Sequence, residues 1–60
     1  MRTKEQESIE ELAYRERICW DMAEVFLLNR DAHGIHDMGV EIQALQRAIA
    51  EVKKLSESDQ

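Results

Sequence analysis

The residues best able to do chemistry in this chain are two histidines and the carboxylates near them. They are His33, His36, Asp31, Asp37 and Glu41. Imidazole and carboxylate groups together are reasonable ligands for zinc or nickel. His33 and His36 stand on either side of Gly34 in an expected turn, so we do not expect them to share a helical face. We interpret the group as turn and capping residues, and predict no metal and no cofactor.

Cys19 is the second candidate for chemistry. It is the chain's one cysteine, so an internal disulfide is excluded. A reactive thiol needs exposure and a nearby base or cation. Cys19 lies instead among apolar residues, which predicts a small, inert core side chain. An alternative is that Cys19 approaches its copy in a symmetric dimer. No catalytic triad order, phosphate loop or H-E-x-x-H motif is visible, so we predict that the protein is not an enzyme.

The balance of charge limits the kinds of partner. The chain has 8 basic and 13 acidic residues, a formal net charge of −5. Nucleic-acid binding and membrane-surface binding both favour a basic face, so nucleic acid is an unexpected partner and no membrane association is predicted. The longest unbroken apolar run, residues 25–28, is far too short to span a bilayer. The lone cysteine and the lack of an export signal in residues 1–10 predict a cytoplasmic protein.

The elements that must position these residues are predicted to be helices. No Pro and two Gly, with abundant Glu, Gln, Ala and Leu, favour an all-α chain. The predicted single domain, residues 1–60, has a first helix over about 4–32, a turn over about 33–37, a second helix over about 38–55 and a frayed tail over 56–60. Capping boxes at Thr3 and at Ser8 are alternative starts. Gly34 is expected just past the first helix, and Asp37 is the expected N-cap of the second.

An apolar seam on the second helix organises the predicted fold. Its members follow at spacings of four and three, from Met38 through Ile42 to Ser56, as on one side of a helix. Folding at the turn makes an antiparallel two-helix hairpin, with Phe26 facing Met38 to Ile42 and Trp20 facing Ala48. The predicted hairpin core is Leu12, Ala23, Met38, Ile42, Leu45, Ala48, Ile49, Val52 and Leu55.

The first helix is apolar around most of its circumference between Ile18 and Leu28. One neighbouring helix cannot cover so wide an apolar surface, so a second chain is implied. We therefore predict that two hairpins associate into a four-helix bundle, with a dimer favoured. The predicted oligomer or partner interface is Ile18, Cys19, Trp20, Met22, Val25, Phe26 and Leu27.

The hairpin layout resembles that of three families of small helical proteins. Its length and turn position are similar to those of the plasmid copy-control RNA-binding dimers, whose RNA-binding face has no counterpart here. The glycine after the first helix and the stretch 41–45 are similar to the sporulation aspartyl-phosphatase family, but the stretch lacks the acid of that family's S-Q-E-L-D motif. Residues 44–50 resemble segments of the hairpin co-chaperones of type III secretion needles.

These observations favour a small regulator, adaptor or co-chaperone that acts by protein–protein contact as a hairpin oligomer. One alternative is a nucleic-acid-binding regulator of the copy-control kind, which would need basic residues gathered on an assembled face. The other is a minimal phosphatase or metal-dependent enzyme that uses the region from His33 to Glu41, which would need a metal at His33 or His36.

Overall fold

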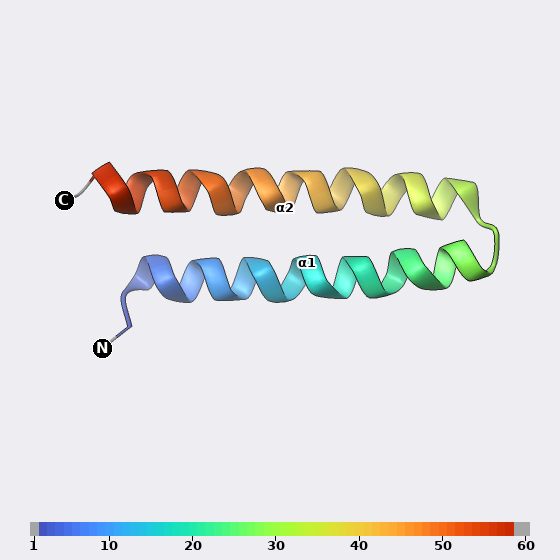
Figure 1. Ribbon diagram of the computed structural model, residues 1–60, viewed down its shortest axis with the longest axis horizontal. Coiled ribbons are helices and arrows are strands. Elements are labelled where there is room, and N and C mark those ends of the chain that lie inside the picture. Colours follow the sequence, from blue (N-terminus) through green and yellow to red (C-terminus); the bar gives the residue numbers. More distant parts are fainter. Residues whose placement is uncertain (1, 59–60) are drawn as a thin grey trace.

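Two long helices folded against each other make up the chain (Figure 1). In this computed structural model, α1 spans Lys4–Leu28 and α2 spans Ala32–Ser58. The structure describes the backbone of residues 2–58 and the side chains of residues 2–55 and 57. The start of α1 and the end of α2 lie at the same end of the molecule, so the helices are antiparallel. The prediction of an all-α hairpin is confirmed, and residues 2–58 contain no strand.

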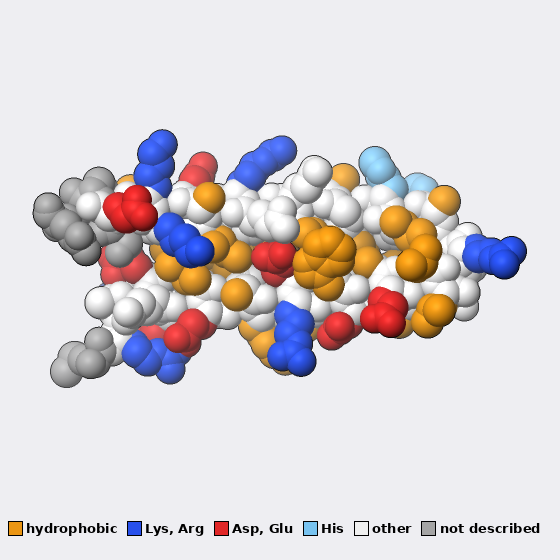
Figure 2. Space-filling model, viewed as in Figure 1, with side chains coloured by type: hydrophobic (Ala, Val, Ile, Leu, Met, Phe, Trp, Pro, Cys, Tyr) orange, Lys and Arg blue, Asp and Glu red, His pale blue; other side chains and the backbone are white. Residues whose placement is uncertain are grey.

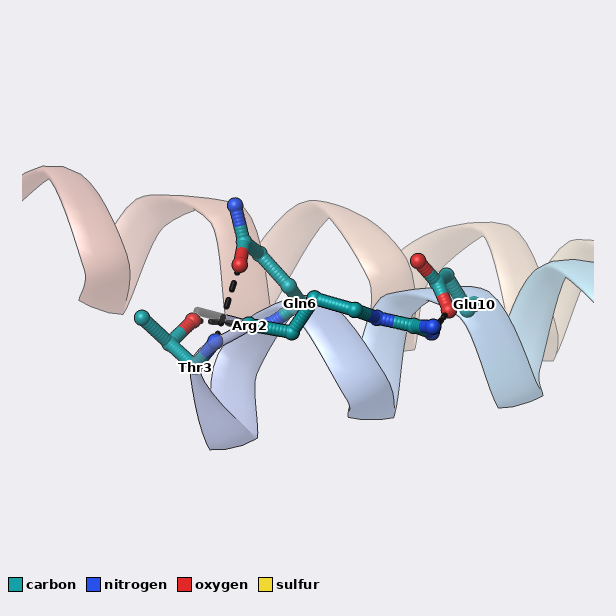
Figure 3. Close-up of polar contacts among 4 residues, drawn as sticks. All are labelled: Arg2, Thr3, Gln6 and Glu10. Carbon is teal, nitrogen blue, oxygen red and sulfur yellow. Dashed lines mark hydrogen bonds and ion pairs between the residues drawn. The ribbon is translucent and has the colours of Figure 1, made fainter.

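The start of α1 is fixed by a capping box at Thr3 (Figure 3). Gln6 N–H donates to Thr3 Oγ1 over 3.1 Å, and Thr3 N–H donates to Gln6 Oε1 over 2.8 Å. These bonds satisfy two backbone N–H groups. Arg2 and Glu10 form an ion pair along the same turns. The Thr3 start is therefore confirmed, and Ser8, the alternative start, lies inside α1.

The turn lies earlier than the sequence predicts, at residues 29–31 instead of about 33–37. Asp31 N–H bonds to the carbonyl of Phe26 and Arg30 N–H bonds to the carbonyl of Leu27, the pair of bonds that defines a Schellman motif. Arg30 has a φ of 56°, so it occupies the left-handed position that Gly34 was expected to take. The prediction was wrong because that position is usually glycine, and here an arginine adopts it.

Asp31 ends the turn and begins α2. Its carboxylate oxygen Oδ1 accepts from Gly34 N–H over 3.0 Å, and its carbonyl accepts from Ile35 N–H over 3.0 Å. Asp31 therefore acts as the N-cap that Asp37 was predicted to supply. Asp37 and His36 lie inside α2, which begins about six residues before its predicted start.

The end of α2 also differs from the prediction. The helix continues through Ser58, so residues 56–58 of the predicted tail belong to α2. Residues 59–60, the rest of the predicted tail, lie outside the described residues, as does the side chain of the seam residue Ser56.

The junction between the helices follows the spacing of four and three on both of them. On α1 the half-buried residues are Glu5, Ile9, Leu12, Glu16, Cys19, Ala23 and Phe26. On α2, Gly34 and Ile42 are buried, and Met38, Leu45, Ala48, Ile49 and Val52 are half-buried. This is the alternation that keeps one narrow stripe of each helix facing the other.

Phe26 packs on Gly34, and this contact sets the register of the hairpin. A Cβ atom added to Gly34 would lie 2.5 Å from Cδ1 and 2.6 Å from Cγ of the Phe26 ring, so the ring rests directly on the glycine backbone. Phe26 was expected to face Met38 to Ile42, and the early turn places Gly34, about one turn before Met38, against its ring. The predicted core residue Leu55 is 65% exposed in the single chain, which is also a correction.

Replacing Arg30 by glycine is expected to stabilise the protein by about 0.5–1 kcal/mol. The left-handed conformation costs a non-glycine residue roughly 1–2 kcal/mol, and the greater freedom of glycine in the unfolded chain offsets part of the gain. Denaturant midpoints at one fixed protein concentration measure the change. Arg47→Gly is the matched control, because Arg47 is an exposed arginine inside α2, where glycine should cost about 1 kcal/mol. Equal losses in both variants would contradict the turn described here.

Candidate functional site

Exposed apolar side chains are the main feature of the surface of the hairpin. Among the described side chains, Ile42, at 5% exposure, is the one apolar side chain that is buried, and α1 buries none. The large apolar side chains left at least one-third exposed are Tyr14, Ile18, Trp20, Met22, Val25, Leu27, Leu28, Ile35, Val40 and Leu55. A continuous exposed apolar patch on a small protein usually marks a contact with another molecule.

The first part of this surface is a strip along α1, formed by Ile18, Met22 and Val25, which we call the Ile18 strip. These residues stand at positions i, i+4 and i+7, so they share one helical face. They are 42%, 44% and 54% exposed. The sequence predicts them as interface residues, and in the single chain nothing covers them fully.

The second part is a groove beside the junction of the two helices, which we call the Trp20 groove. It consists of two adjoining hollows lined by Trp20, Asp21, Ala23, Glu24, Leu27, Ile35, Gly39, Ile42, Gln43 and Gln46. Trp20, Ala23 and Ile35 line both hollows, and the larger hollow has a volume of about 410 Å³. Figure 2 shows apolar side chains gathered along the middle of the molecule on one face, between the two helices.

A polar bridge at one edge of the groove fixes the position of Trp20. The indole Nε1–H of Trp20 donates to Glu16 Oε2 over 3.0 Å, and Gln46 Nε2 donates to the same oxygen over 3.1 Å. Glu16 is half-buried at a seam position of α1, so its carboxylate joins the two helices next to the indole ring. The arrangement holds the tryptophan in place while leaving it more than half exposed.

The charged residues that line the groove are all acidic. Asp21 and Glu24 line the larger hollow. No lysine, arginine or histidine of the described chain lines either hollow. The groove is thus an apolar surface with a negative border.

Cys19 and Phe26, both predicted as interface residues, lie elsewhere in the single chain. They are half-buried at the junction with α2, so they belong to the hairpin contact and not to the outer strip. Trp20 was predicted to face Ala48, and the structure places it beside a hollow that it shares with Gly39, Ile42 and Gln46, which precede Ala48 on α2. The part of α2 that lies beside Trp20 differs from the prediction for the same reason as at Phe26, because the turn comes early.

The two histidines lie on α2, and not on either side of a turn. His33 and His36 are three residues apart in the first turns of the helix, so the expectation that they do not share a face was wrong. His33 Nε2 lies 3.5 Å from Asp37 Oδ2, and both side chains are exposed. Across the described part of the chain, no three His, Cys, Asp or Glu side chains are close enough together to hold a metal ion.

Zinc is therefore expected to leave the melting temperature unchanged, both in the parent and in the His33→Ala, His36→Ala double variant. A ligand that binds only the folded protein must raise its stability, so thermal melts followed by circular dichroism test this directly. A zinc-dependent rise in the parent that disappears in the double variant would show that the histidines bind the metal.

Comparison of the chain with protein-family models, curated proteins and solved structures gave no match. Neither helix has, over its described length, an apolar stretch suited to crossing a membrane. Function is therefore inferred from the geometry of the exposed surface, namely the Ile18 strip and the Trp20 groove.

Sequence reasoning missed Glu16 at the edge of the Trp20 groove and six residues that line it, namely Asp21, Glu24, Ile35, Gly39, Gln43 and Gln46. Glu16 could have been found, because it continues the spacing of Leu12 and Cys19 and so had to lie in the seam. Ile35 and Gly39 could not, because their place beside Trp20 depends on where the turn lies.

Proposed function

We propose that this chain is a non-enzymatic protein-interaction module, a cytoplasmic regulator, adaptor or co-chaperone, that works as a dimer of hairpins. Two hairpins would form a four-helix bundle, with the Ile18 strip of each chain buried between them. The dimer is the working unit, and its remaining exposed apolar surface is available to a partner protein.

The observation that carries this proposal is the size of the core in one chain. A 60-residue chain buries only about 60% of its unfolded surface even in favourable cases. This hairpin has Ile42 as its one buried apolar side chain among those described. Burying a large apolar side chain contributes about 1.5–3 kcal/mol, whereas ordering each residue costs about 1–2 kcal/mol of backbone entropy. A second chain supplies the burial that the hairpin lacks.

The Ile18 strip is the better self-association face because its three residues are uncharged. A two-fold interface brings the same patch of both chains together. At the Ile18 strip this places apolar side chains against each other. At the Trp20 groove it would bring Asp21 and Glu24 towards their own copies, and like charges removed from water repel strongly.

Melting at several protein concentrations tests the proposal. The melting temperature of an obligate dimer rises with protein concentration. Each tenfold increase adds about 1.4 kcal/mol to the stability of the dimer, which corresponds to roughly 5 °C for a pair of 60-residue chains. A melting temperature that stays constant over a hundredfold range of concentration would contradict the proposal.

A further inference from the structure

We infer that the Trp20 groove binds an amphipathic helix of a partner protein, one whose apolar face is flanked by lysine or arginine. This inference rests on the proposed function, because it assumes that self-association uses the Ile18 strip and leaves the groove open.

The shape of the groove suits the side chains of a helix. Ala23 and Gly39 line it without bulk, and a Cβ atom on Gly39 would meet nothing within 4 Å. Trp20, Leu27 and Ile35 supply larger apolar surfaces on both helices. An amphipathic helix places apolar side chains at i, i+3, i+4 and i+7, and such side chains commonly anchor it in an apolar groove between helices.

The charged residues of the groove favour a partner helix with basic residues beside its apolar face. Asp21 and Glu24 would attract basic residues beside the apolar face, and the same carboxylates would disfavour an acidic helix, a second copy of this chain or a nucleic acid. Trp20 adds an exposed aromatic face, the kind that attracts lysine and arginine most strongly.

The Trp20 side chain is already positioned beside the groove before a partner binds. The bonds from Trp20 and Gln46 to Glu16 hold the indole beside the hollow in the absence of a partner. A side chain that is already ordered loses less conformational entropy when a partner binds, which raises the affinity.

The test uses two synthetic helical peptides with the same leucines at i, i+3, i+4 and i+7. Lysines flank the leucines in one peptide and glutamates flank them in the other, and neither contains tryptophan. Trp20 is the chain's one tryptophan, so its fluorescence reports binding at the groove. We expect saturable binding of the basic peptide, at least about tenfold weaker binding of the acidic peptide, and a smaller difference at high salt.

Two pairs of variants locate the binding site. Gly39→Leu places a side chain at the hollow, where its Cβ atom would meet nothing within 4 Å, and should weaken binding of the basic peptide by about tenfold while the helix is preserved. Glu24→Lys should also weaken it, whereas Glu51→Lys, the same change of net charge at an exposed position of α2 that does not line the groove, should leave it nearly unchanged.

Molar mass measured on the same samples tests the dimer separately from peptide binding at the groove. A dimeric parent that binds both peptides equally, or neither, overturns the inference and leaves the proposed function standing. Dissociation of the dimer by Gly39→Leu also overturns it, because a second copy would then occupy the groove. A monomeric parent overturns the proposed function and this inference with it.

Discussion

Replacing Met22 by aspartate is expected to give a monomeric and largely unfolded chain. Met22 is the middle residue of the Ile18 strip and is 44% exposed in a single hairpin, so the hairpin alone would tolerate a charge there. In the proposed dimer the carboxylate would be buried without a partner, at a cost of several kcal/mol. Loss of a large apolar contact adds about 2–5 kcal/mol. Together these exceed what a domain of this size can lose.

Sedimentation and far-ultraviolet circular dichroism at one concentration measure the effect of Met22→Asp. Leu28→Asp is the matched control, because it introduces the same charge at an exposed apolar residue of α1 outside the strip, where Leu28 is 77% exposed. It should cost at most about 1 kcal/mol, mainly from a negative charge at a helix C-terminus. A helical Met22→Asp variant with the mass of the parent would show that the strip is not the interface.

Replacing Gly34 by alanine is expected to destabilise the protein by up to about 2 kcal/mol. The new Cβ atom would stand 2.5–2.9 Å from three atoms of the Phe26 ring, so the ring must leave its place at the turn end of the seam. Overpacking of this kind outweighs the gain of about 1 kcal/mol that alanine brings to a helix. Chemical denaturation at fixed protein concentration measures the loss.

Gly39→Ala provides the opposite expectation on the same helix. Nothing lies within 4 Å of a Cβ atom at Gly39, so alanine should stabilise α2 by up to about 1 kcal/mol. Adding Phe26→Leu to Gly34→Ala should cost less than the sum of the two separate changes, because the ring that clashes is gone. If both glycines respond alike, Phe26 does not rest on Gly34.

The sequence predicts the helices well and the turn poorly, for a local reason. Hydrophobic spacing on α2 and the capping box at Thr3 depend on residue types alone, and both are found in the structure. The position of the turn depends on which residue ends α1 in the left-handed conformation and which residue caps the start of α2. Gly34 and Asp37 have the expected residue types, yet Arg30 and Asp31 take those roles.

The position of the turn also decides how much of the surface could be predicted. The Ile18 strip lies on one helix, so its spacing alone places its residues on one face. The Trp20 groove joins two helices, and an early turn moves Ile35 and Gly39 next to Trp20. Leu55, a predicted core residue that flanks the seam, is exposed near the far end of the hairpin.

The molar mass of the parent protein is the most direct test of its proposed dimeric state. Light scattering on a size-exclusion column should give twice the chain mass of 7.0 kDa, at a concentration where circular dichroism shows a helical protein that melts cooperatively. A mass of one chain for a helical, cooperatively melting species would contradict the account, because the hairpin would then be stable with its apolar strip uncovered.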